Sequence, residues 1–281
     1  MRFSLDHFDL DEFLRSTLAE DLHDIGDITS AAVIPAEARF RGVMDSRDAI
    51  VVAGLPIAEA FFRHLDSDVE IETLVGEGDR AEAGADLMYL SGNARALLTA
   101  ERSALNTVQH LSGIATMTRA YVDRIEGTGA TLLDTRKTIP GLRALEKYAT
   151  RMGGARNHRM GLWDAAMIKD NHVAVAGDIG EAVRRAVAAN IATIIVEVDR
   201  IDQIEPVLEA GGNHLLLDNM EPDMLREAVT LIAGRAKTEA SGGITLDTIR
   251  AKAETGVDYL SVGRLTQSAP AADIGLDFKP E

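Results

Sequence analysis

The second half of the chain alternates short apolar segments with amphipathic ones, and this alternation constrains the fold more than any other feature. Continuous apolar strands that alternate with helices form a parallel sheet covered by helices. Six strands are too few for an eight-stranded barrel. We therefore expect an α/β fold, either an incomplete six-stranded α/β barrel or an open doubly wound sheet. The predicted strands are 131–134, 165–169, 193–198, 214–218, 237–241 and 258–263, and the predicted helices are 141–152, 178–189, 201–210, 221–233 and 245–255.

The first half has a different pattern, which predicts an α+β unit of roughly 90 residues. Residues 8–22 have helical spacing, and GDITS at 26–30 is expected to be a loop. Residues 37–53 and 69–91 are strand-rich, with a short helix at 56–65 between them. A long helix then runs over residues 94–125.

The long helix has two faces. Its apolar face carries Leu97, Ala100, Ala104, Val108, Leu111 and Ala115. The opposite stripe carries Arg102, Asn106, Gln109, Gly113 and Thr116. A solvated stripe is one interpretation, but solvated faces are usually filled by Lys and Glu. Uncharged amides and a glycine favour a stripe that packs against something.

Composition and charge exclude several classes of protein. The chain has 281 residues, 46% hydrophobic and 26% charged, with a net charge of −16. That charge argues against nucleic acid as a partner, because phosphate contacts need a basic face. There is no cysteine, so disulfides and thiolate metal sites are impossible. No apolar run predicts a membrane span, and the first residues lack the layout of a signal peptide. We expect a cytoplasmic protein.

One segment departs from the acidic balance. Residues 134–172 contain eight Lys or Arg and four Asp or Glu, an excess of four positive charges. A basic island in an acidic protein indicates a local anionic ligand. Part of the island has another explanation, because Arg143, Lys147 and Arg151 are spaced four residues apart. We predict that these three lie on a solvated helix face.

Each predicted strand of the second half ends in a polar or glycine-containing motif: DTRK, IKDNH, EVD, LDN, SGG and VGR. In parallel α/β folds the carboxyl ends of the strands form the ligand site. One such ending says little, because capping residues occupy the same positions, but six together predict a site. Arginine binds carboxylates bidentately and lysine acts as a point charge, so we expect anionic substrates. The candidate cations are Arg136, Lys137, His158, Arg159 and Lys169.

Two carboxylates, Glu197 and Asp218, end successive strands. Carboxylates that face a phosphate-rich substrate commonly hold Mg²⁺, and we expect Mg²⁺ here. Helix N-capping is the alternative, and it suits Asp218 better than Glu197, which lies inside an apolar strand. Glycines at 241–243 and 262–264 would let backbone N–H groups converge on a phosphate, helped by the helices that follow.

With these residues in view, the sequence closely resembles the quinolinate phosphoribosyltransferases, also called nicotinate-nucleotide pyrophosphorylases (decarboxylating), which have the type II phosphoribosyltransferase fold. The resemblance spans residues 20–268. Its motifs are EDLHDIGDITS, ERSALNTVQHLSGIAT, DTRKTIPGLRALEKYA, GGARNHRMGLWDAAMIKDNH, VEVD, LLLDN, EASGGI and YLSVGRLTQS.

The resemblance implies an N-terminal α/β sandwich domain, residues 1–110 with 270–281 returning to it, and an incomplete six-stranded α/β barrel, residues 111–269. It implies a head-to-tail homodimer, or a larger assembly, in which each barrel mouth is covered by the partner's N-terminal domain. The substrates would be quinolinate and phosphoribosyl pyrophosphate (PRPP). The products would be nicotinate mononucleotide, CO₂ and pyrophosphate, a step of NAD biosynthesis.

The resemblance also assigns roles to residues. Arg136, His158, Arg159 and Lys169 would form the pocket for the dicarboxylate, and Arg102 would reach the site of the partner subunit. Lys137 would lie between the two substrates. Glu197 and Asp218 would hold ribose hydroxyls and Mg²⁺. The catalytic residues would be Lys137, Lys169, Glu197 and Asp218, and the other substrate contacts would be Thr135, Ser241, Gly242, Gly243, Val262, Gly263 and Arg264.

Two alternatives remain open. One is a related phosphoribosyltransferase, either nicotinate-specific or the molybdenum-uptake-associated paralogue. The excess of cations favours a dicarboxylate over a monocarboxylate. The other is a non-catalytic anion-binding protein on the same barrel, which the intact set of strand-end residues argues against.

Overall fold

The computed structural model describes residues 3–280 and divides into two compact units. The N-terminal unit comprises residues 1–117, 144–154 and 268–281, and the barrel unit comprises residues 118–143 and 155–267. Residues 1, 2 and 281, which the predicted domain ranges include, lie outside the described part. The units differ from those ranges mainly in that residues 144–154 belong to the N-terminal unit. The domain boundary at 110/111 stays a prediction.

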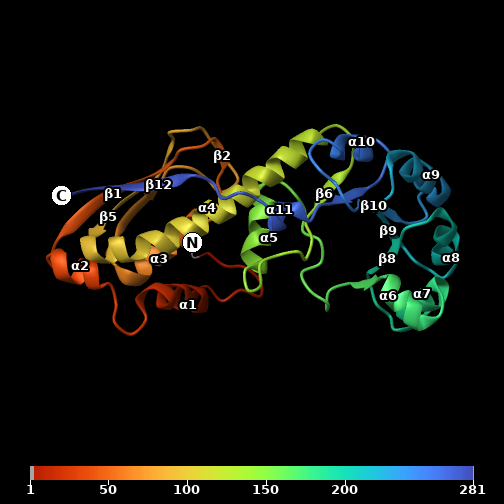
Figure 1. Ribbon diagram of the computed structural model, residues 1–281, viewed down its shortest axis with the longest axis horizontal. Coiled ribbons are helices and arrows are strands. Elements are labelled where there is room, and N and C mark those ends of the chain that lie inside the picture. The colour runs from red at the N-terminus through yellow and green to blue at the C-terminus, as the bar shows by residue number, and fades with distance from the viewer. Residues whose placement is uncertain (1–2, 281) are drawn as a thin grey trace. The chain divides into compact units, whose positions relative to one another are not determined.

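The N-terminal unit is built on a four-stranded antiparallel sheet of order β12-β1-β5-β3. Strand β12, from the end of the chain, pairs along β1 (Figure 1). Side chains on β1 alternate between buried and partly exposed positions, as expected for a sheet with one covered face. The elements are α1 (Leu10–Leu22), α2 (Ile28–Val33), β1 (Arg39–Ser46), β2 (Ile50–Val51), α3 (Leu55–Leu65), β3 (Glu70–Thr73), β4 (Arg80–Ala81), β5 (Asp86–Asn93), α4 (Ala94–Arg124), α5 (Arg143–Met152) and β12 (Ile274–Pro280).

The predicted apolar face of α4 is buried along its whole length, from Leu97 to Ala115. Part of the opposite stripe also packs against the same chain. Gln109 donates from Nε2 to the carbonyl of Ile274 at 2.7 Å, and a Cβ atom on Gly113 would lie 2.0 Å from the Pro270 carbonyl oxygen. The stripe therefore packs against the C-terminal segment at these positions, which confirms that part of the prediction.

Two local predictions were wrong. The GDITS segment is not all loop, because the Asp27 carboxylate accepts hydrogen bonds from the N–H groups of Thr29 and Ser30 and starts α2. Lys147 does not lie on a solvated face, since its exposure is 1%. Helix α5 is covered on the side that carries Lys147, while Arg151 is exposed. Regular spacing identifies residues that share a side but does not show whether that side faces water.

The barrel unit contains the six predicted strands in one parallel sheet of order β6-β11-β10-β9-β8-β7. Strands that follow one another along the chain from β7 to β11 are neighbours, and the last of them pairs with β6. The elements are β6 (Thr131–Leu133), β7 (Ala166–Ile168), α6 (Asp170–Ala176), α7 (Ile179–Ala188), β8 (Ile194–Val198), η1 (Ile201–Gln203), α8 (Ile204–Glu209), β9 (His214–Asp218), α9 (Pro222–Ile232), β10 (Lys237–Ser241), α10 (Ile249–Ala253), β11 (Tyr259–Ser261) and α11 (Arg264–Gln267).

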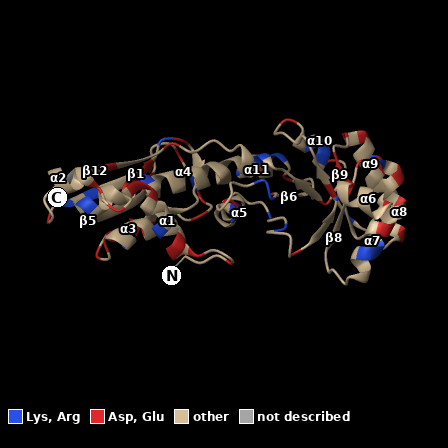
Figure 2. Cartoon of the chain, turned by 60° about the horizontal axis from the view of Figure 1, so that its bottom comes forward, with Lys and Arg blue, Asp and Glu red and all other residues tan. Residues whose placement is uncertain are grey.

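This order resolves the two architectures that the sequence left open. Pairing of the last strand with the first curls the sheet into a barrel, while β6 and β7 stay edge strands, so the barrel is incomplete. Ala165, Ile195 and Leu216 pack together with Met167 in its core. Helices α7 to α9 lie on the outer side of β8 and β9 (Figure 1). Acidic and basic residues are interspersed on these helices (Figure 2), where Glu181 pairs with two arginines of α7.

None of the described helices is both long enough and apolar enough to cross a membrane.

Candidate active site at the carboxyl ends of the barrel strands

The predicted strand-end residues of the barrel unit gather at one edge of its sheet. The parallel register sets Ser241 of β10 beside Asp218 of β9, and Ser261 of β11 beside Leu133 of β6. Thr135, Arg136 and Lys137 follow β6 closely, Lys169 follows β7, Glu197 is the last residue but one of β8, and Val262 to Arg264 follow β11.

Cationic side chains line a cavity of about 530 Å³ in this unit, and the edge strand β7 forms part of its wall. Arg136, Arg159 and Lys169 come from three different segments of the chain to its wall. Arg159 is fixed by a hydrogen bond from Nη1 to the Ala165 carbonyl at 3.2 Å. Burial lowers the pKa of Arg159, and the neighbouring Arg136 lowers it further. Two guanidinium groups held this close favour an anion between them.

Arg136 also has an unpaired hydrogen-bond donor that a ligand could satisfy. Its Nε atom is buried and meets no hydrogen-bond partner among the described residues. A buried donor without an acceptor is costly, and such groups commonly mark places where a ligand or water binds. Arg185 and His172 also line the cavity. The sequence patterns did not single them out.

The two predicted carboxylates lie near a lysine. Lys169 forms a hydrogen-bonded ion pair through Nζ with Glu197 Oε2. Burial raises the pKa of Asp218, and the negative charge of Glu197 raises it further, while Lys169, Asn219 and Lys137 act in the opposite direction. The three side chains are thus close enough to influence each other's charge. Asp218 is held in place by Asn219, which donates from Nδ2 to Oδ2 at 2.6 Å.

This carboxylate pair is compatible with Mg²⁺. Among residues 3–280 no three His, Asp or Glu side chains gather as a self-contained metal site. Mg²⁺ does not require one, because it commonly binds through one or two carboxylates, with waters and substrate phosphates as its other ligands. Burial and, after it, the negative charge of Glu197 raise the pKa of Asp218, and a bound cation would favour its ionised form.

Lys137 is exposed and crosses the loop that follows β11. A Cβ atom on Gly263 would lie 2.8 Å from Lys137 Cδ, so glycine is needed for this close approach. The main chain of Lys137 is tied down at both ends, because its N–H donates to Thr135 Oγ1 at 3.1 Å and its carbonyl accepts from Thr266 Oγ1 at 2.7 Å. The fixed main chain presents the ammonium group from a defined position.

The glycine loop after β10 is shaped by Asn219, the residue that follows β9. Gly242 has φ +89°, and a Cβ atom there would lie 2.1 Å from Asn219 Oδ1. Gly243 is exposed, with φ +59°. The predicted helix at 245–255 is shorter than expected, since α10 covers only Ile249–Ala253. A phosphate here would therefore be bound by loop N–H groups rather than by a long helix.

Arg102 belongs to the N-terminal unit, where it is exposed on α4. The cations that the structure brings together in the barrel unit are Arg136, Lys137, Arg159 and Lys169. His158 lies next to them in sequence, but its side chain is only 7% exposed.

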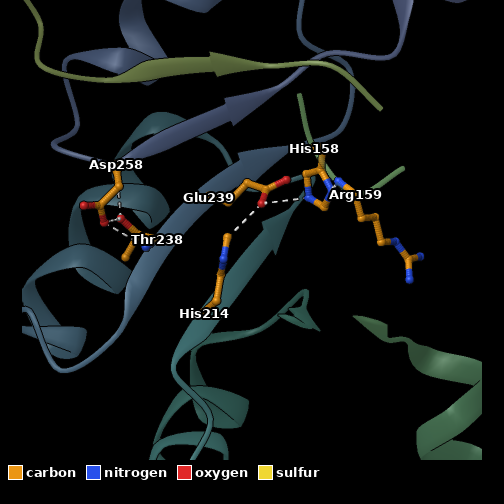
Figure 3. Close-up of polar contacts among 6 residues, drawn as sticks. All are labelled: His158, Arg159, His214, Thr238, Glu239 and Asp258. Carbon is orange, nitrogen blue, oxygen red and sulfur yellow. Dashed lines mark hydrogen bonds and ion pairs between the residues drawn. The ribbon is translucent and has the colours of Figure 1, made fainter. Parts of the chain in front are cut away.

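Two buried acids of the site were missed. Asp134 is fully buried and accepts hydrogen bonds from the N–H of His158 at 2.8 Å and from Asn157 Nδ2 at 2.5 Å. Glu239 is fully buried between His158 and His214 (Figure 3). The sequence held a signal for both, because Asp134 directly follows an apolar strand and Glu239 is an acid inside a predicted strand.

Comparisons with known proteins agree with this architecture. A family model described as the C-terminal domain of quinolinate phosphoribosyl transferase matches residues 114–277, and one described as its N-terminal domain matches residues 27–112. The chain is 45% identical over 272 residues to the nicotinate-nucleotide pyrophosphorylase (carboxylating) of Mycobacterium leprae, covering 94% of this chain and 95% of that protein.

Identity to quinolinate phosphoribosyltransferase (decarboxylating) 2, mitochondrial, of Nicotiana glauca is 39% over 294 residues, covering 98% of this chain and 83% of that protein. The crystal structure of NadC from Streptococcus pyogenes superposes with a TM-score of 0.94 at 38% identity, covering 99% of each chain. The chain therefore belongs to the quinolinate phosphoribosyltransferase family.

Proposed function

We propose that this protein transfers the phosphoribosyl group of PRPP to quinolinate and decarboxylates the product, giving nicotinate mononucleotide, CO₂ and pyrophosphate. The observation that carries the proposal is the cavity with Arg136, Arg159 and Lys169 in its wall, beside the Glu197–Asp218 pair. Three cations from separate segments suit a substrate with two carboxylates, and the adjacent acids suit one that arrives with Mg²⁺.

The reaction is a substitution at C1 of the ribose. The pyridine nitrogen of quinolinate forms a bond to C1 while the bond from C1 to pyrophosphate breaks, through an oxocarbenium-like state. The ring nitrogen becomes cationic, so the 2-carboxylate leaves as CO₂ and the resulting carbanion at C2 takes up a proton. Mg²⁺, when bound, neutralises charge on the departing pyrophosphate. The protein supplies position and charge complementarity, and no nucleophilic side chain is required.

Each side chain then has a distinct task. Arg136, Arg159 and Lys169 bind the two carboxylates, and Lys137 lies between quinolinate and the pyrophosphate. Glu197 and Asp218 hold Mg²⁺ and the ribose hydroxyls. Thr135 and the loops at 241–243 and 262–264 surround the phosphoribosyl group.

Arg102 enters from a second subunit of a homodimer and contacts a carboxylate. Its exposure on α4 supports this role, because it is free to meet a surface outside its own helix. We place the activity in the cytoplasm, as the composition of the chain suggests.

A direct assay tests the substrate. Purified protein, PRPP and Mg²⁺ are incubated with quinolinate labelled at its 2-carboxylate, or with nicotinate. We expect release of labelled CO₂ together with nicotinate mononucleotide. Consumption of nicotinate without consumption of quinolinate would overturn the substrate assignment. Tight quinolinate binding without CO₂ release, with either Mg²⁺ or Mn²⁺, would show an anion-binding protein instead.

A further inference from the structure

The buried Glu239 has no role in the chemistry described so far. It lies in the middle of β10, level with Leu216 of β9 and Tyr259 of β11, and two residues before the strand-end Ser241. Its Oε2 atom is 2.8 Å from His214 Nε2 and 3.3 Å from His158 Nε2 (Figure 3). Burial raises the pKa of Glu239, but the hydrogen bonds from His158 and His214 outweigh it and lower the pKa to about 2. The group is therefore a buried carboxylate anion at neutral pH.

The second ring nitrogen of His158 defines its protonation state. The main-chain N–H of Arg159 donates to His158 Nδ1 at 2.7 Å. A backbone N–H can only donate, so Nδ1 must present a lone pair, and the ring proton resides on Nε2, which donates to Glu239. In an imidazolium both nitrogens are donors, and two donors would then face each other at 2.7 Å. In this arrangement His158 is neutral.

The same contacts fix the segment that carries Arg159. Asp134 accepts hydrogen bonds from the main chain of His158 and the side chain of Asn157. Glu239 holds the His158 ring from the barrel interior, and the ring holds the Arg159 main chain. The guanidinium group extends away from this anchor (Figure 3) to the cavity wall that it shares with Arg136.

We propose that Glu239 is a positioning residue of the substrate site: it holds His158 as the neutral Nε2–H tautomer, and His158 anchors the main chain of Arg159 without contributing positive charge to the cation cluster. This differs from the sequence prediction that counted His158 among the cations. The consequence for the site rests on the proposed binding of quinolinate by Arg159. The tautomer does not depend on any substrate.

The tautomer can be measured directly by NMR of ¹⁵N-histidine-labelled protein at pH 7 without ligands, with the His158 signals assigned by His158→Gln. We expect an unprotonated Nδ1 and a protonated Nε2. A signature of two protonated nitrogens, or of a proton on Nδ1 alone, would overturn the proposal. This result is independent of turnover, so it distinguishes failure of the proposal from failure of the substrate assignment.

Two substitutions test the anchor in the working enzyme. His158→Asn removes any possibility of charge but keeps an oxygen acceptor close to the position of Nδ1, where the Arg159 N–H donates, whereas His158→Leu removes both. We expect His158→Leu to raise KM for quinolinate at least about tenfold while KM for PRPP changes less than about twofold, and we expect His158→Asn to retain most of the affinity that His158→Leu loses. Equal loss in the two variants would mean that a charged imidazole is required. Unchanged KM for quinolinate in both would mean that the anchor has no effect.

His64→Asn, at an exposed position on α3, serves as the matched control. Circular dichroism and thermal unfolding of each variant establish that the folded fraction is the same. A Leu variant that fails to fold leaves the NMR measurement on the natural protein as the deciding result.

Discussion

The barrel holds carboxylates at two levels, and their environments are opposite. Asp218 and Glu239 lie on neighbouring strands, with Asp218 one inward-facing position closer to the carboxyl edge. Burial raises the pKa of both groups. In Glu239 two histidine donors reverse this effect and lower the pKa to about 2. In Asp218 the neighbouring Glu197 adds to the effect of burial, and the pKa stays above its ordinary value despite Lys169.

The difference separates a group that stabilises the fold from one that is kept available for a ligand. Glu239 Oε2 meets two histidines of its own chain and the pKa of Glu239 is lowered, so its ionisation favours the folded state. Asp218 is ionised at some cost to the folded state, and a bound cation would remove that cost. Active sites commonly sacrifice stability in this way, whereas interiors do not.

The largest expected effect is a loss of activity at Lys169, at the carboxyl edge of the barrel sheet. Lys169→Ala should lower kcat/KM for quinolinate roughly 30- to 4,000-fold, equivalent to about 2–5 kcal/mol, because it removes a charge partner from a bound carboxylate. Steady-state kinetics with both substrates measures it. Arg200→Ala is the matched control, since Arg200 is an exposed cation whose partners are Asp199 and Asp202. A loss smaller than about threefold would remove Lys169 from the site.

A second experiment asks whether the substrate site needs a residue from a second subunit. Arg102→Ala should be nearly as inactive as Lys169→Ala if Arg102 contacts a carboxylate in a partner's site. Subunits of the two variants, mixed and reassembled at random, should then recover up to about a quarter of the natural activity, because half of the dimers have one intact site. Absence of recovery despite demonstrated subunit exchange would place Arg102 in the site of its own chain.

Substitution of Glu239, inside the barrel, is expected to change stability more than substitution of Asp218 at the carboxyl edge. Glu239→Gln should lower the free energy of unfolding at pH 7 by at most about 3 kcal/mol, the amount that corresponds to a pKa lowered from 4.5 to about 2, and by less when His158 is neutral, because a charged His158 contributes to that lowering. The folded pKa is depressed, so this contribution is present above pH 4.5 and is lost as the pH falls toward 2. Urea unfolding at pH 7, 5 and 3 should show the natural protein and the variant converging. A constant difference would assign the effect to packing.

The sequence pattern alone predicts the residues at the carboxyl edge of the barrel much better than the residues inside it. Lys169, Glu197 and Asp218 come together because parallel strands end at the same side of a sheet, a rule that depends only on locating the strands. Glu239 depends on His214, 25 residues away, and on His158, 81 residues away. No local period links these three positions. An acid within the short KTEAS strand is conspicuous in sequence, but its partners are known only from the fold.

The error at Lys147 has a related cause. The four-residue spacing of Arg143, Lys147 and Arg151 describes one helix correctly, and Arg151 is indeed exposed. Lys147 is buried because α5 packs within the N-terminal unit, where His110 contacts the neighbouring Glu146 at 2.9 Å. What covers a helix is decided by segments far away in the sequence. The charge of a side chain does not settle it.

The smallest expected effect is a change in stability at Asp218, and it completes the contrast between the two carboxylates. Asp218→Asn should impair turnover yet raise the free energy of unfolding of the ligand-free protein by about 0.5–2 kcal/mol, as relief of active-site strain commonly does. The folded pKa of Asp218 is raised, so its unfavourable contribution exists where the group is ionised and disappears as the pH falls below 3.8. The gain should therefore shrink in acid, opposite to a stabilising carboxylate, and added Mg²⁺ with PRPP should stabilise the natural protein but not the variant. Thermal unfolding at pH 7 and pH 4, with and without these ligands, measures all three. A variant less stable than the natural protein at pH 7 would show that Asp218, like Glu239, supports the fold.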